Sequence, residues 1–173
     1  ENRKFRIALS LAINRDEINE FVYAGMSEPR QAVPSKYSPY YNSRYDQFAK
    51  SYIEYDPQRA NELLDEIGLT SRDPEGYRLR PDGKPISITI EFFETIGTTM
   101  ADTCELLTNY LKDVGIKVAP KPEEQVLWIT RITSGQHEAA VYGASGGFSP
   151  LAEPMFHFPV ATNCYWAPLY GAW

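Results

Sequence analysis

The chain has 173 residues, enough for one domain with a hydrophobic core or for one lobe of a larger protein. Hydrophobic residues make up 43% and charged residues 23%, as in an ordinary globular protein. The formal net charge of -6 argues against nucleic acid and against an anionic membrane surface as partners, because phosphate groups bind basic surfaces. The sequence contains no charge-free apolar run long enough to span a bilayer.

Two helices are predicted at the start of the chain. Asn14 is placed to cap the second one, with Glu17 three residues later in a capping-box pattern, and Gly25 is placed to end it. The segment before Asn14 puts five apolar residues on one helical face: Phe5, Ala8, Leu9, Ala12 and Ile13.

Residues 26–55 lose this periodicity and are predicted to form a long loop. Between positions 29 and 45 of this stretch, three prolines are interleaved with four tyrosines: Pro29, Pro34, Pro39, Tyr37, Tyr40, Tyr41 and Tyr45. A long ordered loop in a compact domain usually binds or covers something, so we expect such a role here.

The segment "YDPQRANELLDEIG" predicts a helix, with Asp56 as the N-cap, Pro57 in the first turn and Gly68 after the last turn. Its apolar residues recur at helical spacing: Ala60, Leu63, Leu64 and Ile67. A polar connection with turn signals at 74–76 and 82–83 follows and predicts a short hairpin.

The second half of the chain reads as strand, helix, strand, helix, strand. Alternating residues predict a strand over 86–92, a helical stripe runs from Met100 to Val114, and "IKVAP" is a short strand. "EEQVLWITRITSG" is a helix that ends at glycine, and the apolar run "EAAVYG" at 138–143 predicts a central strand. Alternating strands and helices indicate an α/β fold with a mostly parallel sheet and flanking helices.

Cysteine and histidine carry little functional signal. Cys104 lies on the apolar stripe of an expected helix and is predicted to be a buried free thiol, and nothing pairs it with Cys164. His137 and His157 lie in different segments without metal-binding spacing. We therefore expect no metal and no cofactor.

The tail after Glu153 has no charged residue and many aromatic rings. Pro159 and Pro168 exclude a long helix. The rings either fill the core of this chain or pack against a partner: Phe156, Phe158, Tyr165, Trp166, Tyr170 and Trp173.

The stretch "GASGG" at 143–147 fits the pattern G-x-S-x-G of a nucleophile elbow around Ser145. That motif needs a helix directly after the serine, but "GGFSPLAEP" has two glycines and two prolines, and Glu153 and His157 follow too closely to complete a triad. The stretch also lacks the lysine and the following helix that a phosphate-binding loop needs. The stretch follows the carboxyl end of an expected strand, where α/β sheets bind ligands, so it is predicted to be a ligand-binding loop.

Several of these segments resemble family 5 of the extracellular solute-binding proteins, the receptors of ABC importers for oligopeptides, dipeptides and nickel. "RIALSLAINRDEINEFVYAG" resembles the helix pair of that family, and "YDPQRANELLDEIGL" resembles its next conserved helix. The turn with "DGKP" and the helix closing on "LKDVGIKV" follow in the family's order, so the resemblance covers most of residues 1–155.

The resemblance implies a two-lobed type II periplasmic-binding-protein fold that closes around its ligand by a hinge. Residues 1–173 would be a single lobe, a fragment of the C-terminal lobe, with the N-terminal lobe and a last return segment missing. We expect both ends to be cut, since the chain opens inside a helix and stops within an aromatic run. The family also implies an extracytoplasmic location, a membrane permease as partner, and reversible binding without enzymatic activity.

The ligand class stays open between peptides and oligosaccharides. Peptide-binding members commonly carry a tryptophan where Tyr142 stands and an aspartate in the next loop that pairs with the peptide amine. Here no carboxylate follows until Glu153, and an unpaired buried ammonium is costly. Members that bind oligosaccharides use aromatic platforms and small polar groups, as this loop offers, whereas two histidines disfavour nickel.

In the ligand site we expect Tyr142 and Phe148 to supply apolar faces and Ser145 a hydroxyl group. Trp128 is expected in the core, and Glu124 as a solvated acid in the first turn of its helix. The residues predicted to line the cleft are Tyr142, Ser145, Gly146, Gly147, Phe148, Gln125 and Trp166.

Overall fold

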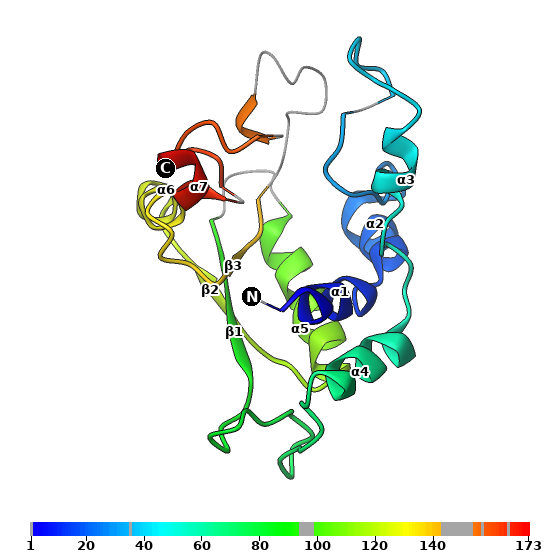
Figure 1. Cartoon of the computed structure of the whole chain (residues 1–173), viewed down its shortest axis with the longest axis vertical. Coiled ribbons are helices and arrows are strands. Elements are labelled where there is room, and N and C mark those ends of the chain that lie inside the picture. The colour runs from blue at the N-terminus through cyan, green and yellow to red at the C-terminus, as the bar shows by residue number, and fades with distance from the viewer. Residues whose placement is uncertain (1, 35, 94–98, 143–153, 157, 166) are drawn as a thin grey trace. The chain divides into compact units, whose positions relative to one another are not determined.

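A computed structural model describes residues 2–34, 36–93, 99–142, 154–156, 158–165 and 167–173. Contacts divide the chain into two compact units: unit 1 consists of Glu1–Pro29, Tyr52–Ile90 and Ala101–Lys121, and unit 2 of Arg30–Ser51, Glu91–Met100 and Pro122–Trp173. The elements follow in chain order (Figure 1): α1 (Arg3–Leu11), α2 (Arg15–Tyr23), α3 (Tyr45–Ala49), α4 (Pro57–Glu66), β1 (Ser87–Phe92), α5 (Met100–Asp113), β2 (Lys117–Pro122), α6 (Gln125–Thr133), β3 (Ala139–Ala140), a 3-10 turn η1 (Pro154–Phe156) and α7 (Pro168–Ala172).

The predicted helix starts in unit 1 are confirmed by their caps. The Asn14 side chain accepts a hydrogen bond from Glu17 N at 3.1 Å, and the Asp56 side chain accepts one from Arg59 N at 2.8 Å. Helix α2 ends at Ala24, whose φ of 51° is left-handed. Local chemistry therefore sets these boundaries, as the sequence pattern indicates.

Helices α1 and α4 pack against each other within unit 1 (Figure 1). Each contributes a fully buried alanine, Ala8 and Ala60. Small side chains let two helices approach closely, and an ion pair between Lys4 and Glu66, 2.9 Å long, joins their exposed edges.

The polar connection after α4 forms the predicted turns. Isolated antiparallel bridges join Arg72 with Arg78 and Leu79 with Pro85, one around each turn signal. Arg78 is 1% exposed and anchors the connection to its surroundings, because it donates to Val114 O at 2.9 Å and to Asn61 Oδ1 at 2.7 Å.

The sheet has the order β2-β1-β3 among the described residues. Lys117 N donates to Ile86 O at 3.0 Å, and further along Glu123 N donates to Phe92 O at 2.9 Å. Donor and acceptor advance together along the chain, which is the pattern of a parallel pair. The predicted parallel connection through α5 is therefore confirmed.

The prediction of a central strand over 138–143 is wrong for the described residues, because β1 holds the middle position. Strand β3 covers only Ala139–Ala140, and Ala140 is exposed. The apolar character of this run does not reflect burial on both faces of a sheet. Its largest side chain, Tyr142, packs among aromatic rings instead.

The predicted long loop contains one short helix, α3, which its sequence pattern did not indicate. Gln31 binds the far side of the loop, since its backbone N–H donates to Ala49 O at 2.9 Å and its side chain donates to Ser51 O at 2.8 Å. These long-range bonds order the segment where helical periodicity is absent.

The rings of the tail differ in their exposure. Tyr165 is half-buried in unit 2, whereas Phe158 is 54%, Tyr170 72% and Trp173 102% exposed. A core role is therefore wrong for these three exposed rings, and Trp166 lies outside the described residues.

Both cysteines, Cys104 and Cys164, are buried and free, as predicted for Cys104. Within the described ranges, no helix combines the length and the apolar character needed to cross a membrane.

Candidate functional site

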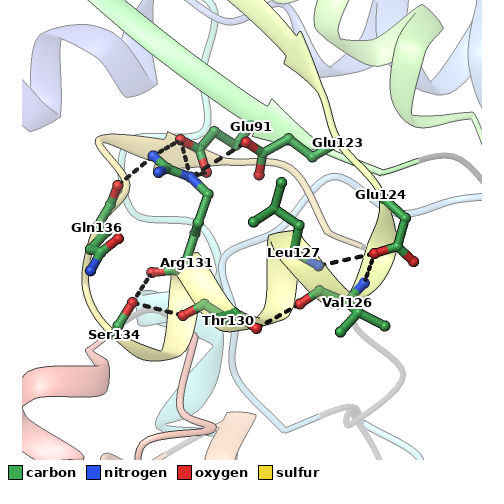
Figure 2. Close-up of polar contacts among 9 residues, drawn as sticks. All are labelled: Glu91, Glu123, Glu124, Val126, Leu127, Thr130, Arg131, Ser134 and Gln136. Carbon is green, nitrogen blue, oxygen red and sulfur yellow. Dashed lines mark hydrogen bonds and ion pairs between the residues drawn. The ribbon is translucent and has the colours of Figure 1, made fainter.

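Helix α6 in unit 2 carries the side chains around which the candidate site is built. The Glu124 carboxylate caps it by accepting from Val126 N at 2.8 Å and from Leu127 N at 3.1 Å (Figure 2). Glu124 is thus the N-cap itself, rather than the first-turn acid that the sequence predicted. The expected stop is confirmed, because Gly135 follows the helix with φ 69°.

Trp128 is the buried centre of an aromatic cluster in unit 2. Its side chain is fully buried, as expected from its place on α6, and packs with Phe93 and Ile132. The Phe93 ring lies 5.1 Å from the Trp128 ring in an edge-on arrangement. Such a geometry is favoured by the ring quadrupoles and stabilises beyond the area buried.

Tyr142 lies at the boundary between this cluster and solvent. Its ring stacks on Trp128 at 5.3 Å with 22° between the planes, and Tyr165 meets it edge-on at 5.2 Å. The Tyr142 side chain is still 39% exposed. Neighbouring rings therefore support a tyrosine that keeps part of its surface available.

Arg131, one turn after Trp128 on α6, forms an ion cluster with two buried carboxylates from outside the helix (Figure 2). Arg131 Nε lies 3.1 Å and 3.0 Å from the two carboxylate oxygens of Glu91, and Arg131 Nη2 lies 2.5 Å from Oε1. The Glu91 side chain is 2% exposed, and a hydrogen bond from Arg131 compensates its burial. That bond also raises the pKa of Arg131 above its ordinary value.

A second carboxylate approaches the same guanidinium group. Glu123 Oε1 lies 3.4 Å from Arg131 Nε, and the Glu123 side chain is 3% exposed. Arg131 Nη2 also donates to Gln136 O at 2.7 Å, so the arginine connects β1, the end of β2 and the turn after α6.

His137 follows this cluster in the chain. Burial lowers the pKa of its imidazole, Glu91 raises it and Arg131 lowers it. Its Nδ1 atom is buried without a hydrogen-bond partner. The described residues contain no group of three or more His, Cys, Asp or Glu side chains that could hold a metal ion.

Two of the predicted cleft residues are described, and both lie in unit 2. Tyr142 belongs to the aromatic cluster, and Gln125 is the exposed first residue of α6. The other predicted cleft residues lie outside the described residues: Ser145, Gly146, Gly147, Phe148 and Trp166.

The residues that support Tyr142 are not evident from the sequence pattern. Phe93 and Tyr165 contact it from distant positions in the chain, and no local pattern signals this. Glu91 stands at a polar position of an alternating strand and is nevertheless buried. An arginine on the buried face of a helix, three residues after a buried tryptophan, is the signal that could have indicated a buried acid.

Comparison with known proteins identifies the relatives of this chain. Residues 1–163 match the model of bacterial extracellular solute-binding proteins, family 5 Middle. The oligopeptide-binding protein OppA of Lactococcus lactis is 28% identical over 163 residues, which cover 89% of this chain and 25% of that protein. The di/tripeptide-binding protein 1 of Pseudomonas aeruginosa is 28% identical over 141 residues, which cover 82% of this chain and 24% of that protein.

A solved structure of an oligopeptide-binding protein OppA superimposes with a TM-score of 0.85 at 40% identity, covering 98% of this chain and 26% of that one. The fold is therefore the α/β fold of type II periplasmic binding proteins, with a parallel sheet and flanking helices. The chain spans about a quarter of the length of these relatives. Because the family model matches nearly the whole chain, this protein belongs to family 5 of the bacterial extracellular solute-binding proteins.

Proposed function

We propose that this chain is part of one lobe of an extracytoplasmic receptor that binds peptides and delivers them to an ABC importer in the membrane. Relatives named for oligopeptide and di/tripeptide binding support the peptide class. The chain spans about a quarter of their length, which supports a second lobe elsewhere in the same protein. The ligand would be enclosed between the two lobes.

The observation that carries the proposal is the stack of Tyr142 on Trp128. A ring with 39% of its surface exposed and neighbouring rings 5.2–5.3 Å away is held in one orientation before any ligand arrives. Preorganised aromatic surfaces bind apolar ligand faces at a low entropic cost. Tyr142 would therefore form one wall of the ligand site.

We also propose that Gln125 and the loop residues after Tyr142 complete this wall. Gln125 is exposed at the first turn of α6 and offers an amide to ligand polar groups. The remaining members are proposed from the sequence alone: Ser145, Gly146, Gly147, Phe148 and Trp166. Ser145 would serve as a hydrogen-bonding group rather than as a nucleophile, so the receptor would have no enzymatic activity.

The charges near Tyr142 bear on the ligand class. The buried carboxylates of Glu91 and Glu123 both face Arg131, so neither is offered to a peptide amine. In a peptide receptor the amine would then be held by Glu153 or by the second lobe. The partly exposed Tyr142 ring makes oligosaccharides the second candidate, because aromatic rings pack against sugar faces.

Thermal unfolding of the complete receptor distinguishes these classes. The protein is heated with di- to pentapeptides and, separately, with cello-, xylo- and manno-oligosaccharides. A ligand at a hundred times its Kd stabilises by about 2.7 kcal/mol, so a peptide-dependent rise in Tm is expected. A rise with sugars alone would replace peptide by oligosaccharide, and a rise with neither class would contradict the proposal.

A second measurement tests the absence of enzymatic activity. A fluorophosphonate probe labels activated serine nucleophiles, and the complete receptor is expected to stay unlabelled. Labelling that disappears in Ser145→Ala would instead establish a serine hydrolase.

A further inference from the structure

Glu91 is bound from two directions in unit 2. Its carboxylate binds the Arg131 guanidinium group with Nε–O distances of 3.0 and 3.1 Å (Figure 2). Its backbone oxygen accepts a hydrogen bond from Val141 N at 3.0 Å. Val141 directly precedes Tyr142. Glu91 of β1 therefore binds both α6 and the segment that carries Tyr142, the proposed wall of the ligand site.

Two side-chain contacts are described between α6 and the end of β1 with the residue that follows it, Phe93. Glu91 and Phe93 are two residues apart, so they project to the same side of an extended chain. Arg131 and Trp128 are three residues apart, so they project to the same side of a helix. Glu91 binds Arg131, and the Phe93 ring packs on Trp128 at 5.1 Å.

These two contacts constrain the helix differently. Ring contacts are weakly directional and tolerate small displacements, whereas a guanidinium fork on a carboxylate is planar and directional. A buried ion pair contributes little net stability compared with apolar side chains of the same size, and its attested use is to select one arrangement. A directional polar contact is therefore suited to fixing the position of α6 along β1.

We propose that the Glu91–Arg131 ion pair is a positioning device that holds α6 in register on β1 and so keeps Trp128 stacked against Tyr142. Glu123 and Gln136 O bind the same guanidinium group and restrict its rotation. Neither Glu91 nor Arg131 needs to touch the ligand. The expected effect on ligand affinity rests on the proposed function, whereas the effect on the ring stack does not.

The ring stack is measured first in the ligand-free complete receptor. The near-UV circular dichroism difference between the wild type and Tyr142→Leu defines the signal that depends on Tyr142. Glu91→Gln, Arg131→Met and the double variant are expected to lose most of this signal, and the double variant no more than the single ones. Arg131→Lys keeps the charge but not the fork, and it is expected to lose the signal as well.

Asp65→Asn provides a control in unit 1, because the 54% exposed Asp65 carboxylate is the ion-pair partner of the buried Arg78. This variant is expected to lower Tm and to leave the Tyr142 signal unchanged. If the Glu91–Arg131 ion pair has a merely structural role, Glu91→Gln should also lower Tm and leave the Tyr142 signal unchanged. A full signal in Glu91→Gln or in Arg131→Lys would overturn the positioning role.

Affinity for whichever peptide or oligosaccharide stabilises the wild type is measured second. Glu91→Gln is expected to weaken binding by about threefold to thirtyfold, the range of indirect coupling between sites. If the ring signal is lost and the affinity is unchanged, the ion pair does position the rings, but Tyr142 is not a ligand contact. An unchanged signal with reduced affinity would contradict the positioning role and leave the proposed function intact.

Discussion

Tyr142 and Trp128 lie with their ring planes 22° apart and their centroids separated by 5.3 Å, one ring partly exposed and the other fully buried. The buried Trp128 ring packs in the core of unit 2, and stacking on it orients the partly exposed Tyr142 ring. Core packing and the proposed ligand surface are thus parts of one cluster, so variants of the two residues should have separable effects.

Trp128→Ala is expected to lower the free energy of unfolding by about 3–5 kcal/mol, because it empties the space of a large buried side chain. Trp173→Ala is the control, since Trp173 is 102% exposed and its removal should change stability by no more than about 0.5 kcal/mol. Urea unfolding of both variants measures the difference. Equal losses would contradict the assignment of Trp128 as the core ring.

Arg78→Met is expected to destabilise unit 1 by at least about 3 kcal/mol, because Val114 O and Leu69 O lose the guanidinium group that donates to them. The Arg78 side chain donates hydrogen bonds to Val114 O and Asn61 Oδ1, and Arg78 is 1% exposed. Arg80→Met, two residues away in an exposed ion pair with Asp82, is the matched control and should leave the urea midpoint unchanged. A similar midpoint for both variants would show that Arg78 is dispensable.

Gly115→Ala is expected to cost more stability than Gly68→Ala. Both residues follow helices with left-handed φ values of 84° and 88°, so both variants pay about 1–2 kcal/mol of backbone strain. A Cβ atom at Gly115 would also lie 2.9 Å from Arg78 Cγ and 3.0 Å from Gly76 O, whereas the space at Gly68 is open. The Gly115 variant should lose at least about 1 kcal/mol more, and equal losses in urea unfolding would contradict this close contact.

His137 is expected to make the protein less stable at mildly acidic pH. Burial lowers the pKa of His137 in the folded state, so the unfolded chain binds this proton first as the pH falls. The stability contributed by neutral His137 is present above the unfolded pKa of about 6.5 and is lost as the pH falls from there towards the folded pKa.

His137→Gln removes this titration and tests it. The Tm difference between the wild type and the variant is expected to shift in favour of the variant between about pH 7.5 and about pH 5.5. Carboxylates titrate in both proteins, so their contribution to the change of Tm with pH cancels in this difference. A difference that stays constant across this range would contradict the expected linkage.

Much of unit 1 could be predicted from local sequence because its boundaries depend on neighbouring residues. The Asn14 and Asp56 caps each bind a backbone N–H three residues later. Even here the capping box differs in detail, since the Glu17 carboxylate accepts from the Asn14 side chain. Patterns of this kind need no knowledge of the remote chain.

The candidate site could be predicted only in part, because its contacts join remote residues. The alternating pattern placed Glu91 on a polar face, but its partner Arg131 lies 40 positions later and allows its burial. Tyr142 was identified by its position at the end of a predicted strand, whereas its contact with Tyr165 depends on the path of the chain after residue 153. Spacing along the chain carries no information about such pairs.

Calorimetry on the complete receptor tests whether Tyr142 forms a wall of the ligand site. The titrants are the peptides or oligosaccharides that raise the Tm of the wild type. Tyr142→Ala is expected to raise Kd by about tenfold or more. Tyr170→Ala is the control, because it removes a 72% exposed ring from the same unit and should leave Kd unchanged. A folded Tyr142→Ala variant that binds with the wild-type Kd would contradict the account.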